Sequence, residues 1–160
     1  MIIRIIAVGR LREKYWQDAA ADFARRLRPY ARLEVIEVSE AHIKEAASLA
    51  DEKKAMQEEA RAILDKLKRH SGPVIALDRK GKALDSPGLA AGLHKMILEG
   101  KTEVAFVIGG PLGLATEVTE RADLLLSFSL MTFPHQMMRV ILLEQIYRIF
   151  RIMHGQPYHK

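Results

Sequence analysis

Continuous apolar runs of strand length alternate with longer segments of helical spacing along this chain. The apolar runs lie at residues 2–8, 33–38, 74–78, 104–108 and 124–128, and the helical segments at 13–28, 43–68, 86–99, 117–122 and 134–153. A run that is apolar throughout is typical of a strand buried on both faces, and strands that alternate with helices form a mostly parallel sheet. The pattern therefore predicts an α/β fold with helices on both faces of the sheet.

Proline and capping signals set several of the expected boundaries. Pro29 ends the first helix, Pro134 opens the last one, and Ser86 before Pro87 is the expected N-cap of the third helix. Strand three is expected to end in a loop over residues 79–85. No linker, repeat or low-complexity stretch interrupts the 160 residues, so we predict a single domain spanning residues 1–160.

Three loops that follow the third, fourth and fifth strands are the candidate ligand site. They comprise residues 77–82, the glycine-rich stretch 109–113 and residues 128–133. Parallel sheets bind ligands at the carboxyl ends of their strands, so these loops converge if the three strands are neighbours. The sequence GGPLG matches neither the dinucleotide nor the triphosphate signature, and the apolar, backbone-rich loops fit an adenine-like ring and a thioether better. The alternative is that the glycines only form a strand-to-helix turn.

Composition excludes several classes of protein. The chain has no cysteine, which removes disulfides, thiolate nucleophiles and cysteine metal ligands, and His135, His154 and His159 lack metal-ligand spacing. We therefore expect no metal. The apolar start of the chain contains Arg4 and is too short and too charged for a signal peptide or a membrane span. A cytoplasmic protein without a membrane partner is expected.

The net charge of +5 is unevenly distributed along the sequence. Lysine, arginine and histidine concentrate at residues 25–32, 66–70, 79–82 and 148–160. Clusters of positive charge favour a polyanion such as nucleic acid as the partner, because neutralised phosphates release counterions. A solvated basic face is the alternative interpretation.

The last helix places polar groups in an otherwise apolar element. At 100° per residue Glu144, Arg148 and Arg151 lie on one side, which an ordinary i,i+4 ion pair also explains. The apolar remainder predicts burial on two sides, by the sheet and by a second subunit. The terminal residues 158–160 would ordinarily form a frayed tail.

Three stretches of sequence closely resemble the RlmH family, which belongs to the SPOUT superfamily of S-adenosylmethionine-dependent RNA methyltransferases. They are IIRIIAVGRLREKYW at 2–16, IGGPLGL at 108–114 and FSLMTFPHQMMRVILLEQIYRIFRIMHGQPYHK at 128–160. The resemblance runs over the whole chain without a missing segment. Its most specific residues are Phe133-Pro134-His135, Arg139, Glu144, Tyr147-Arg148 and Pro157-Tyr158-His159.

The resemblance implies a fold, an activity and partners. The fold is a sheet with a C-terminal trefoil knot of the SPOUT type, although chains are generally unknotted. The activity is N3-methylation of a pseudouridine in helix 69 of 23S rRNA, and the implied enzyme is a cytoplasmic homodimer that acts on the assembled ribosome and not on DNA.

The resemblance also implies site residues. S-adenosylmethionine is expected against the three strand-end loops, at Leu77, Gly109, Phe128, Ser129, Leu130, Met131, Thr132 and Phe133. The expected catalytic set is His159, Tyr158, Arg148, Arg139 and Glu144. His159 is the first candidate for the base because histidine titrates near neutral pH, whereas Arg139 is expected to hold a phosphate or the cofactor carboxylate. The tail of one subunit is expected to approach the site of its partner.

Two other classes of function remain open at this point. A ribosome-binding module without enzymatic activity needs the basic clusters but not the apolar loops. A flavodoxin-like protein needs the loops, but it binds flavin or a mononucleotide. Binding of S-adenosylmethionine separates these alternatives from a methyltransferase.

Overall fold

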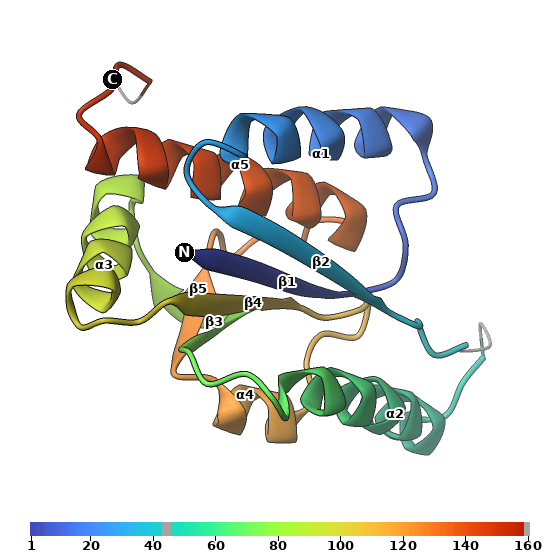
Figure 1. Ribbon diagram of the computed structural model, residues 1–160. Coiled ribbons are helices and arrows are strands. Elements are labelled where there is room, and N and C mark those ends of the chain that lie inside the picture. The colour runs from blue at the N-terminus through green and yellow to red at the C-terminus, as the bar shows by residue number, and fades with distance from the viewer. Residues whose placement is uncertain (43–45, 159–160) are drawn as a thin grey trace.

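One parallel sheet organises the computed structural model, which describes residues 1–42 and 46–158 (Figure 1). The elements are β1 (Ile2–Val8), α1 (Lys14–Leu27), β2 (Arg32–Val38), α2 (Leu49–Leu67), β3 (Val74–Ala83), α3 (Ser86–Leu98), β4 (Glu103–Ile108), α4 (Thr116–Arg121), β5 (Leu124–Ser127) and α5 (His135–Met153). The strand order is β2-β1-β4-β3-β5, and every described pairing is parallel. The α/β prediction is confirmed, and the trefoil knot stays a prediction.

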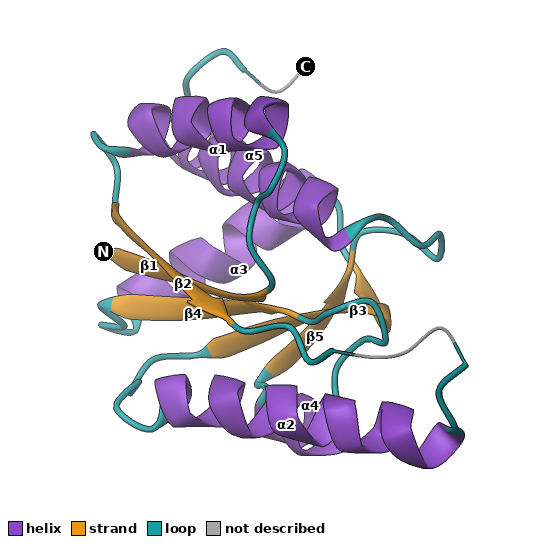
Figure 2. Cartoon of the chain, turned by 90° about the vertical axis from the view of Figure 1, so that its right-hand side faces the viewer, coloured by secondary structure: helices purple, strands orange, loops and turns teal. Residues whose placement is uncertain are grey.

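Helices cover both faces of the sheet, as the apolar runs predicted. Helices α1, α3 and α5 lie on one face, and α2 and α4 lie on the other (Figure 2). Alternate residues of β1 enter the two cores, with Ile3 and Ile5 on the α5 side and Ile6 and Val8 on the α2 side. Burial on both faces explains why this strand is apolar almost throughout.

Helix α5 packs against the sheet between α1 and α3. Leu142, Leu143 and Ile146 are fully buried in the larger core. Burying aliphatic side chains of this size stabilises the fold by roughly 1.5–3 kcal/mol each. The predicted contact of this helix with the sheet is confirmed, and its contact with a second subunit stays a prediction.

The start of α3 differs from the expectation by one residue. The N-cap is Asp85 and not Ser86, because the Asp85 side chain accepts a hydrogen bond from the Gly88 N–H at 2.8 Å. Ser86 and Pro87 are consequently the first helical residues. Aspartate and serine are both good N-caps, so the adjacent pair made the boundary ambiguous in the sequence.

The start of α2 was predicted too early. Residues 43–45 lie outside the described residues, and residues 46–48 are not helical. Ser48 is the N-cap: its hydroxyl accepts from the Asp51 N–H at 3.2 Å, and the Asp51 carboxylate accepts from the Ser48 N–H at 3.1 Å. This reciprocal capping box defines where the helix begins.

Strand β3 is longer than its apolar run. The predicted loop 79–85 is instead strand up to Ala83, with an irregularity in its pairing to β5. Leu77 and Lys82 both lie opposite Leu126, so residues 78–81 form an excursion of β3 that interrupts its pairing with β5. A polar, interrupted segment of this kind has no alternating pattern by which the sequence could reveal it.

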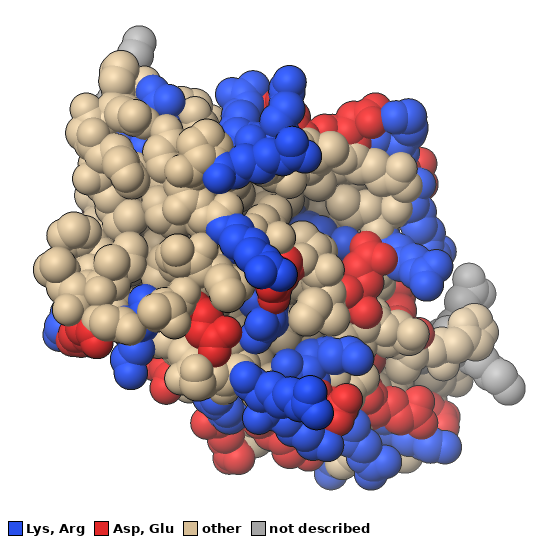
Figure 3. Space-filling view, in the orientation of Figure 1, with Lys and Arg blue, Asp and Glu red and all other residues tan. Residues whose placement is uncertain are grey.

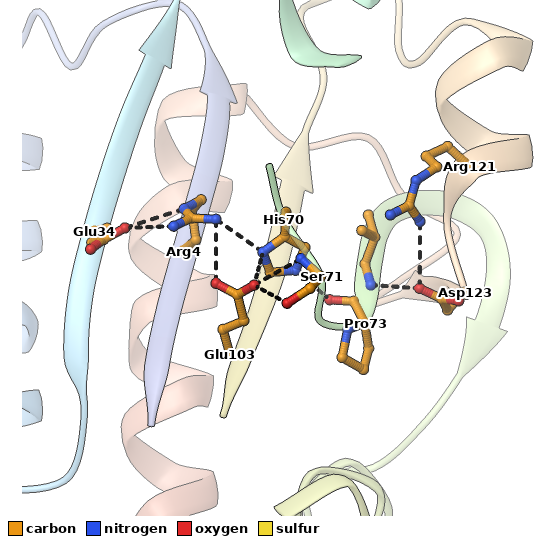
Figure 4. Close-up of polar contacts among 9 residues, drawn as sticks. Arg4, Glu34, His70, Ser71, Pro73, Glu103, Arg121 and Asp123 are labelled. Carbon is orange, nitrogen blue, oxygen red and sulfur yellow. Dashed lines mark hydrogen bonds and ion pairs between the residues drawn. The ribbon is translucent and has the colours of Figure 1, made fainter. Parts of the chain in front are cut away.

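A polar network fixes the sheet near the amino-terminal ends of β3 and β4 (Figure 4). Arg4 of β1 donates to Glu34 of β2 at 3.0 Å and lies 3.6 Å from Glu103 of β4. The Ser71 N–H and hydroxyl both donate to Glu103 at 2.8 Å, and the Ser71 N–H holds the pKa of this carboxyl below its usual range. The buried His70 imidazole lies 3.0 Å from Arg4. The network joins three strands and the segment before β3, at the end of the sheet opposite the predicted ligand loops.

Candidate functional site

A cavity of about 780 Å³ lies at the ends of β4 and β5 and beside residues 77–80 of β3. Because these three strands are neighbours, the structure brings the three predicted loops together around it. The predicted cofactor residues that line the cavity are Leu77, Gly109, Phe128, Ser129, Met131, Thr132 and Phe133. Leu130 is not among the lining residues, and 84% of its surface is exposed. Each of the three predicted loops thus contributes residues to the cavity wall.

The glycine-rich loop after β4 is closely packed. A Cβ atom on Gly109 would lie 2.8 Å from the Gly113 carbonyl oxygen and 2.9 Å from a methyl group of Leu114. Gly113 has a φ of +88° and donates its N–H to the Gly110 carbonyl at 3.0 Å. The glycines are therefore needed to close the loop, and they leave backbone groups at the cavity wall.

Glu59 of α2 supports this loop from behind and is the site residue that sequence reasoning missed. It is 6% exposed, and its carboxylate accepts a hydrogen bond from the Ala41 N–H at 3.0 Å. A Cβ atom on Gly110 would lie 2.9 Å from this carboxylate, so the two groups are in direct contact. Burial raises the pKa of Glu59, and the nearby Glu40 adds to the effect. In the sequence, Glu59 is one of many charged residues of α2. Only its position on the apolar side of the helix could have indicated that it is buried.

The beginning of α5 forms another part of the cavity wall. His135 lines the cavity, and Arg139, one turn further, is 2% exposed. The Arg139 guanidinium donates to Glu37 at 2.6 Å and to the Gly9 carbonyl at 2.7 Å. Both terminal nitrogens are thus bonded within the chain, and Arg139 is not among the cavity-lining residues. In this structure it ties α5 to the ends of β1 and β2, which differs from its expected role of holding a phosphate or a carboxylate.

A second polar cluster lies further along α5. Arg148 donates to Glu144 at 2.5 and 3.0 Å, so the expected i,i+4 ion pair is present. The Tyr158 hydroxyl donates to the same carboxylate at 3.2 Å, and the Tyr158 ring lies 4.7 Å from the Arg148 guanidinium carbon. The tail is therefore packed on the helix as far as Tyr158. His159 and Lys160 lie outside the described residues.

Electrostatics fix the protonation states in this cluster. The Glu144 hydrogen bond raises the pKa of Arg148, which keeps the guanidinium charged. Burial raises the pKa of Tyr158, and the Glu144 carboxylate raises it further. The phenol thus stays protonated at neutral pH and acts as a hydrogen-bond donor rather than as a base.

The two clusters are separate within one chain. None of Glu144, Arg148 and Tyr158 lines the cavity. Glu144 lies nine residues beyond His135 on α5, which corresponds to roughly 13 Å along the helix axis. Within one chain, the described members of the predicted catalytic set are therefore separate from the residues that line the cavity.

The basic clusters of the sequence are partly neutralised in space. Arg25 and Arg26 both pair with Asp22, and Lys68 pairs with Asp65. Arg148 pairs with Glu144. Figure 3 shows lysine and arginine side chains across the centre, right and bottom of the face drawn, with carboxylates between them, whereas its left side is mostly uncharged. Exposed pairs of this kind add little stability, but they reduce the positive field that a polyanion meets.

Two features are absent from the described residues. No group of histidine, aspartate and glutamate side chains there could hold a metal ion. No helix among these residues has the length and hydrophobicity to cross a membrane.

Comparisons with known proteins place the chain in context. A family model described as predicted SPOUT methyltransferase matches residues 1–159. The chain is 50% identical over 160 residues to ribosomal RNA large subunit methyltransferase H of Carboxydothermus hydrogenoformans, with full coverage of both proteins. It is 47% identical over 160 residues, again with full coverage of both, to a putative ribosomal RNA large subunit methyltransferase H of Methanococcus maripaludis.

Solved structures share the fold at low identity. A probable methylase family protein from Haemophilus influenzae superimposes with a TM-score of 0.53 at 13% identity, covering 99% of this chain and 70% of that one. A putative methylase family protein from Neisseria gonorrhoeae gives a TM-score of 0.54 at 13% identity, covering 99% and 85%.

The buried carboxyl of Glu59 predicts a pH-dependent stability difference. Because its pKa is raised in the folded state, ionisation costs stability progressively as the pH rises above the usual value of 4.5. Glu59→Gln keeps an oxygen for the Ala41 N–H and does not titrate. Urea unfolding should therefore show the variant gaining stability relative to wild type between about pH 4 and pH 7. The matched control is Glu58→Gln at the exposed neighbouring position. Equal pH trends in the two variants would contradict the assignment.

Proposed function

We propose that this chain transfers a methyl group from S-adenosylmethionine to N3 of a pseudouridine in helix 69 of 23S rRNA. The chain belongs to the SPOUT methyltransferase family and is an rRNA methyltransferase. The observation that carries the proposal is the convergence of three strand-end loops on one cavity, at positions that resemble the cofactor loops of the RlmH family. Family membership argues against the two alternatives, a binding module without enzymatic activity and a flavodoxin-like protein.

The cavity residues fit this cofactor. The volume of about 780 Å³ lies in the range of small-molecule sites, and Phe128, Phe133 and Met138 give the wall an apolar character. The Gly109–Gly113 loop adds backbone groups that can recognise an adenine edge. When bound, S-adenosylmethionine supplies an electrophilic methyl group. The role of the loops is to align that group with the nucleotide, and alignment alone lowers such barriers by several kcal/mol.

The nucleotide imposes a second requirement. The N3 atom of pseudouridine is an imide nitrogen, and its lone pair becomes nucleophilic only when its proton is lost. The enzyme must therefore assist proton loss and stabilise the negative charge that develops on the neighbouring carbonyl oxygens. Arg148 is a permanent cation and Tyr158 a protonated donor, so both suit the second task. His159 remains the candidate base.

The separation of the two clusters supports a site shared between subunits. We infer that the protein is a homodimer in which Glu144, Arg148 and the tail of one chain face the cavity of its partner. Because Arg148 and Tyr158 of one chain are in contact, both belong to the same side of this shared site. The assembled site acts on the ribosome in the cytoplasm.

The proposed activity is tested by incubating the protein with methyl-labelled S-adenosylmethionine and either intact ribosomes or naked rRNA. We expect the label on N3 of a pseudouridine in helix 69, located by nuclease mapping and mass spectrometry. Intact ribosomes should react faster, because a single compact domain has little surface with which to order a flexible RNA. Label at another position would contradict the proposed substrate, and equal rates would contradict recognition of the assembled particle.

The shared site predicts a specific pattern of complementation. Deleting residues 158–160 removes the tail, and Gly109→Val fills the glycine loop, so each homodimer should lose most of its turnover while the truncated one still binds S-adenosylmethionine. In a mixture, half of the dimers are heterodimers with one intact site, which restores roughly a quarter of wild-type activity. Mixing the truncated chain with Arg148→Ala is the matched control and should restore nothing, because both changes affect the same side of the site. Restoration in both mixtures, or full activity of the truncated homodimer, would contradict the arrangement.

A further inference from the structure

The excursion of β3 brings two cations to the rim of the cavity. Residues 78–81 interrupt the pairing of β3 with β5, because Leu77 and Lys82 both lie opposite Leu126. Asp78, Arg79 and Lys80 of this excursion line the cavity, and Arg79 and Lys80 are exposed. The irregular pairing therefore places charged side chains at the rim of the cavity.

The backbone of the excursion is held in place. The hydroxyl of the buried Ser127 donates to the Arg79 carbonyl at 3.0 Å, and the Lys80 N–H donates to the Asp78 carboxylate at 2.7 Å. A Cβ atom on Gly81 would lie 2.6 Å from the Leu125 carbonyl group, so this glycine lets the two backbones approach closely. The positions of the two cationic side chains are consequently set by the sheet and not by a free loop.

The two cations have no carboxylate partner in the described part of the chain. No aspartate or glutamate oxygen there lies within 4.0 Å of the Arg79 or Lys80 side-chain nitrogens, in contrast to Arg25 and Arg26. Arg79 donates to the Thr132 hydroxyl at 3.2 Å, which directs its guanidinium along the loop after β5. Asp78 is the single carboxylate of the lining, and one of its oxygens is already bonded to the Lys80 N–H. The rim thus carries a net positive charge beside a cavity whose remaining lining is apolar and neutral polar, apart from His135.

We propose that Arg79 and Lys80 bind backbone phosphates of the substrate RNA next to the nucleotide that enters the cavity. The proposal rests on the proposed function, since it names how that site holds its substrate. Guanidinium and ammonium groups that are not neutralised by a carboxylate are suited to phosphate oxygens, and such contacts fix the register of a nucleic acid without reading its sequence. The three loops then hold S-adenosylmethionine, and the rim holds the strand whose target base faces the cofactor's methyl group.

The test compares two double variants that lower the net charge equally. Arg79→Gln/Lys80→Gln removes the rim cations. Lys53→Gln/Arg61→Gln removes two exposed cations of α2 that lie outside the cavity and form no ion pair with the described residues. Binding to ribosomes is measured at several salt concentrations, and S-adenosylmethionine binding is measured separately by calorimetry. We expect the rim variant to bind ribosomes about tenfold more weakly near 0.1 M salt, with a salt slope lower by about two. The α2 variant should retain nearly the wild-type affinity and slope, and both variants should bind S-adenosylmethionine as wild type does.

Other outcomes overturn the proposal in distinguishable ways. An equal loss in both double variants would show that only overall charge matters. Weaker S-adenosylmethionine binding in the rim variant would assign Arg79 and Lys80 to the cofactor carboxylate instead of a phosphate. A wild-type protein that binds no S-adenosylmethionine would contradict the proposed function itself, whereas normal cofactor binding with unchanged ribosome binding by the rim variant would contradict only this inference.

Discussion

The parallel pairing of β3 between β4 and β5 is the constraint on which the site depends. The carboxyl ends of neighbouring parallel strands lie at the same edge of a sheet. The predicted ligand loops of β3, β4 and β5 therefore lie close together around the cavity. Ile75 sets this register from the middle, since it lies opposite Phe106 on one side and Leu124 on the other. At the opposite edge, the network around Arg4 and Glu103 fixes the strands that support the cavity.

Much of the fold could be predicted because its strands are buried on both faces. Such strands are apolar throughout, as Val104–Ile108 illustrates, and they stand out from the charged helices between them. The failures occur where polar residues decide the structure. Residues 79–83 belong to β3 although they carry no strand pattern, and Asp85 caps α3 although Ser86 is an equally good candidate. In both cases the outcome depends on contacts that the local sequence does not specify.

The sequence could predict the part of the site that is formed by the backbone of the loops. Glycine and proline mark the loops after β4 and β5, and these loops line the cavity. Side chains that act across long sequence distances could not be predicted. Arg139 bonds to Glu37 about 100 residues away, and Glu59 supports Gly110 from another helix. The position of Tyr158 shows the same limit, because the helix pattern predicts the Glu144–Arg148 pair but not the tail that packs on it.

The central claim is that three strand-end loops form one cofactor site, and a calorimetric titration with S-adenosylmethionine tests it most directly. Wild type and Gly92→Ala should bind one equivalent per chain, because a Cβ atom on Gly92 has no neighbouring atom within 4 Å. Gly109→Val, with its fold verified by circular dichroism, should show no binding, because a Cβ atom there would lie 2.8 Å from the Gly113 carbonyl oxygen and force apart the loop that lines the cavity. Absence of binding to wild type, or unchanged affinity in a folded Gly109→Val protein, would contradict the account.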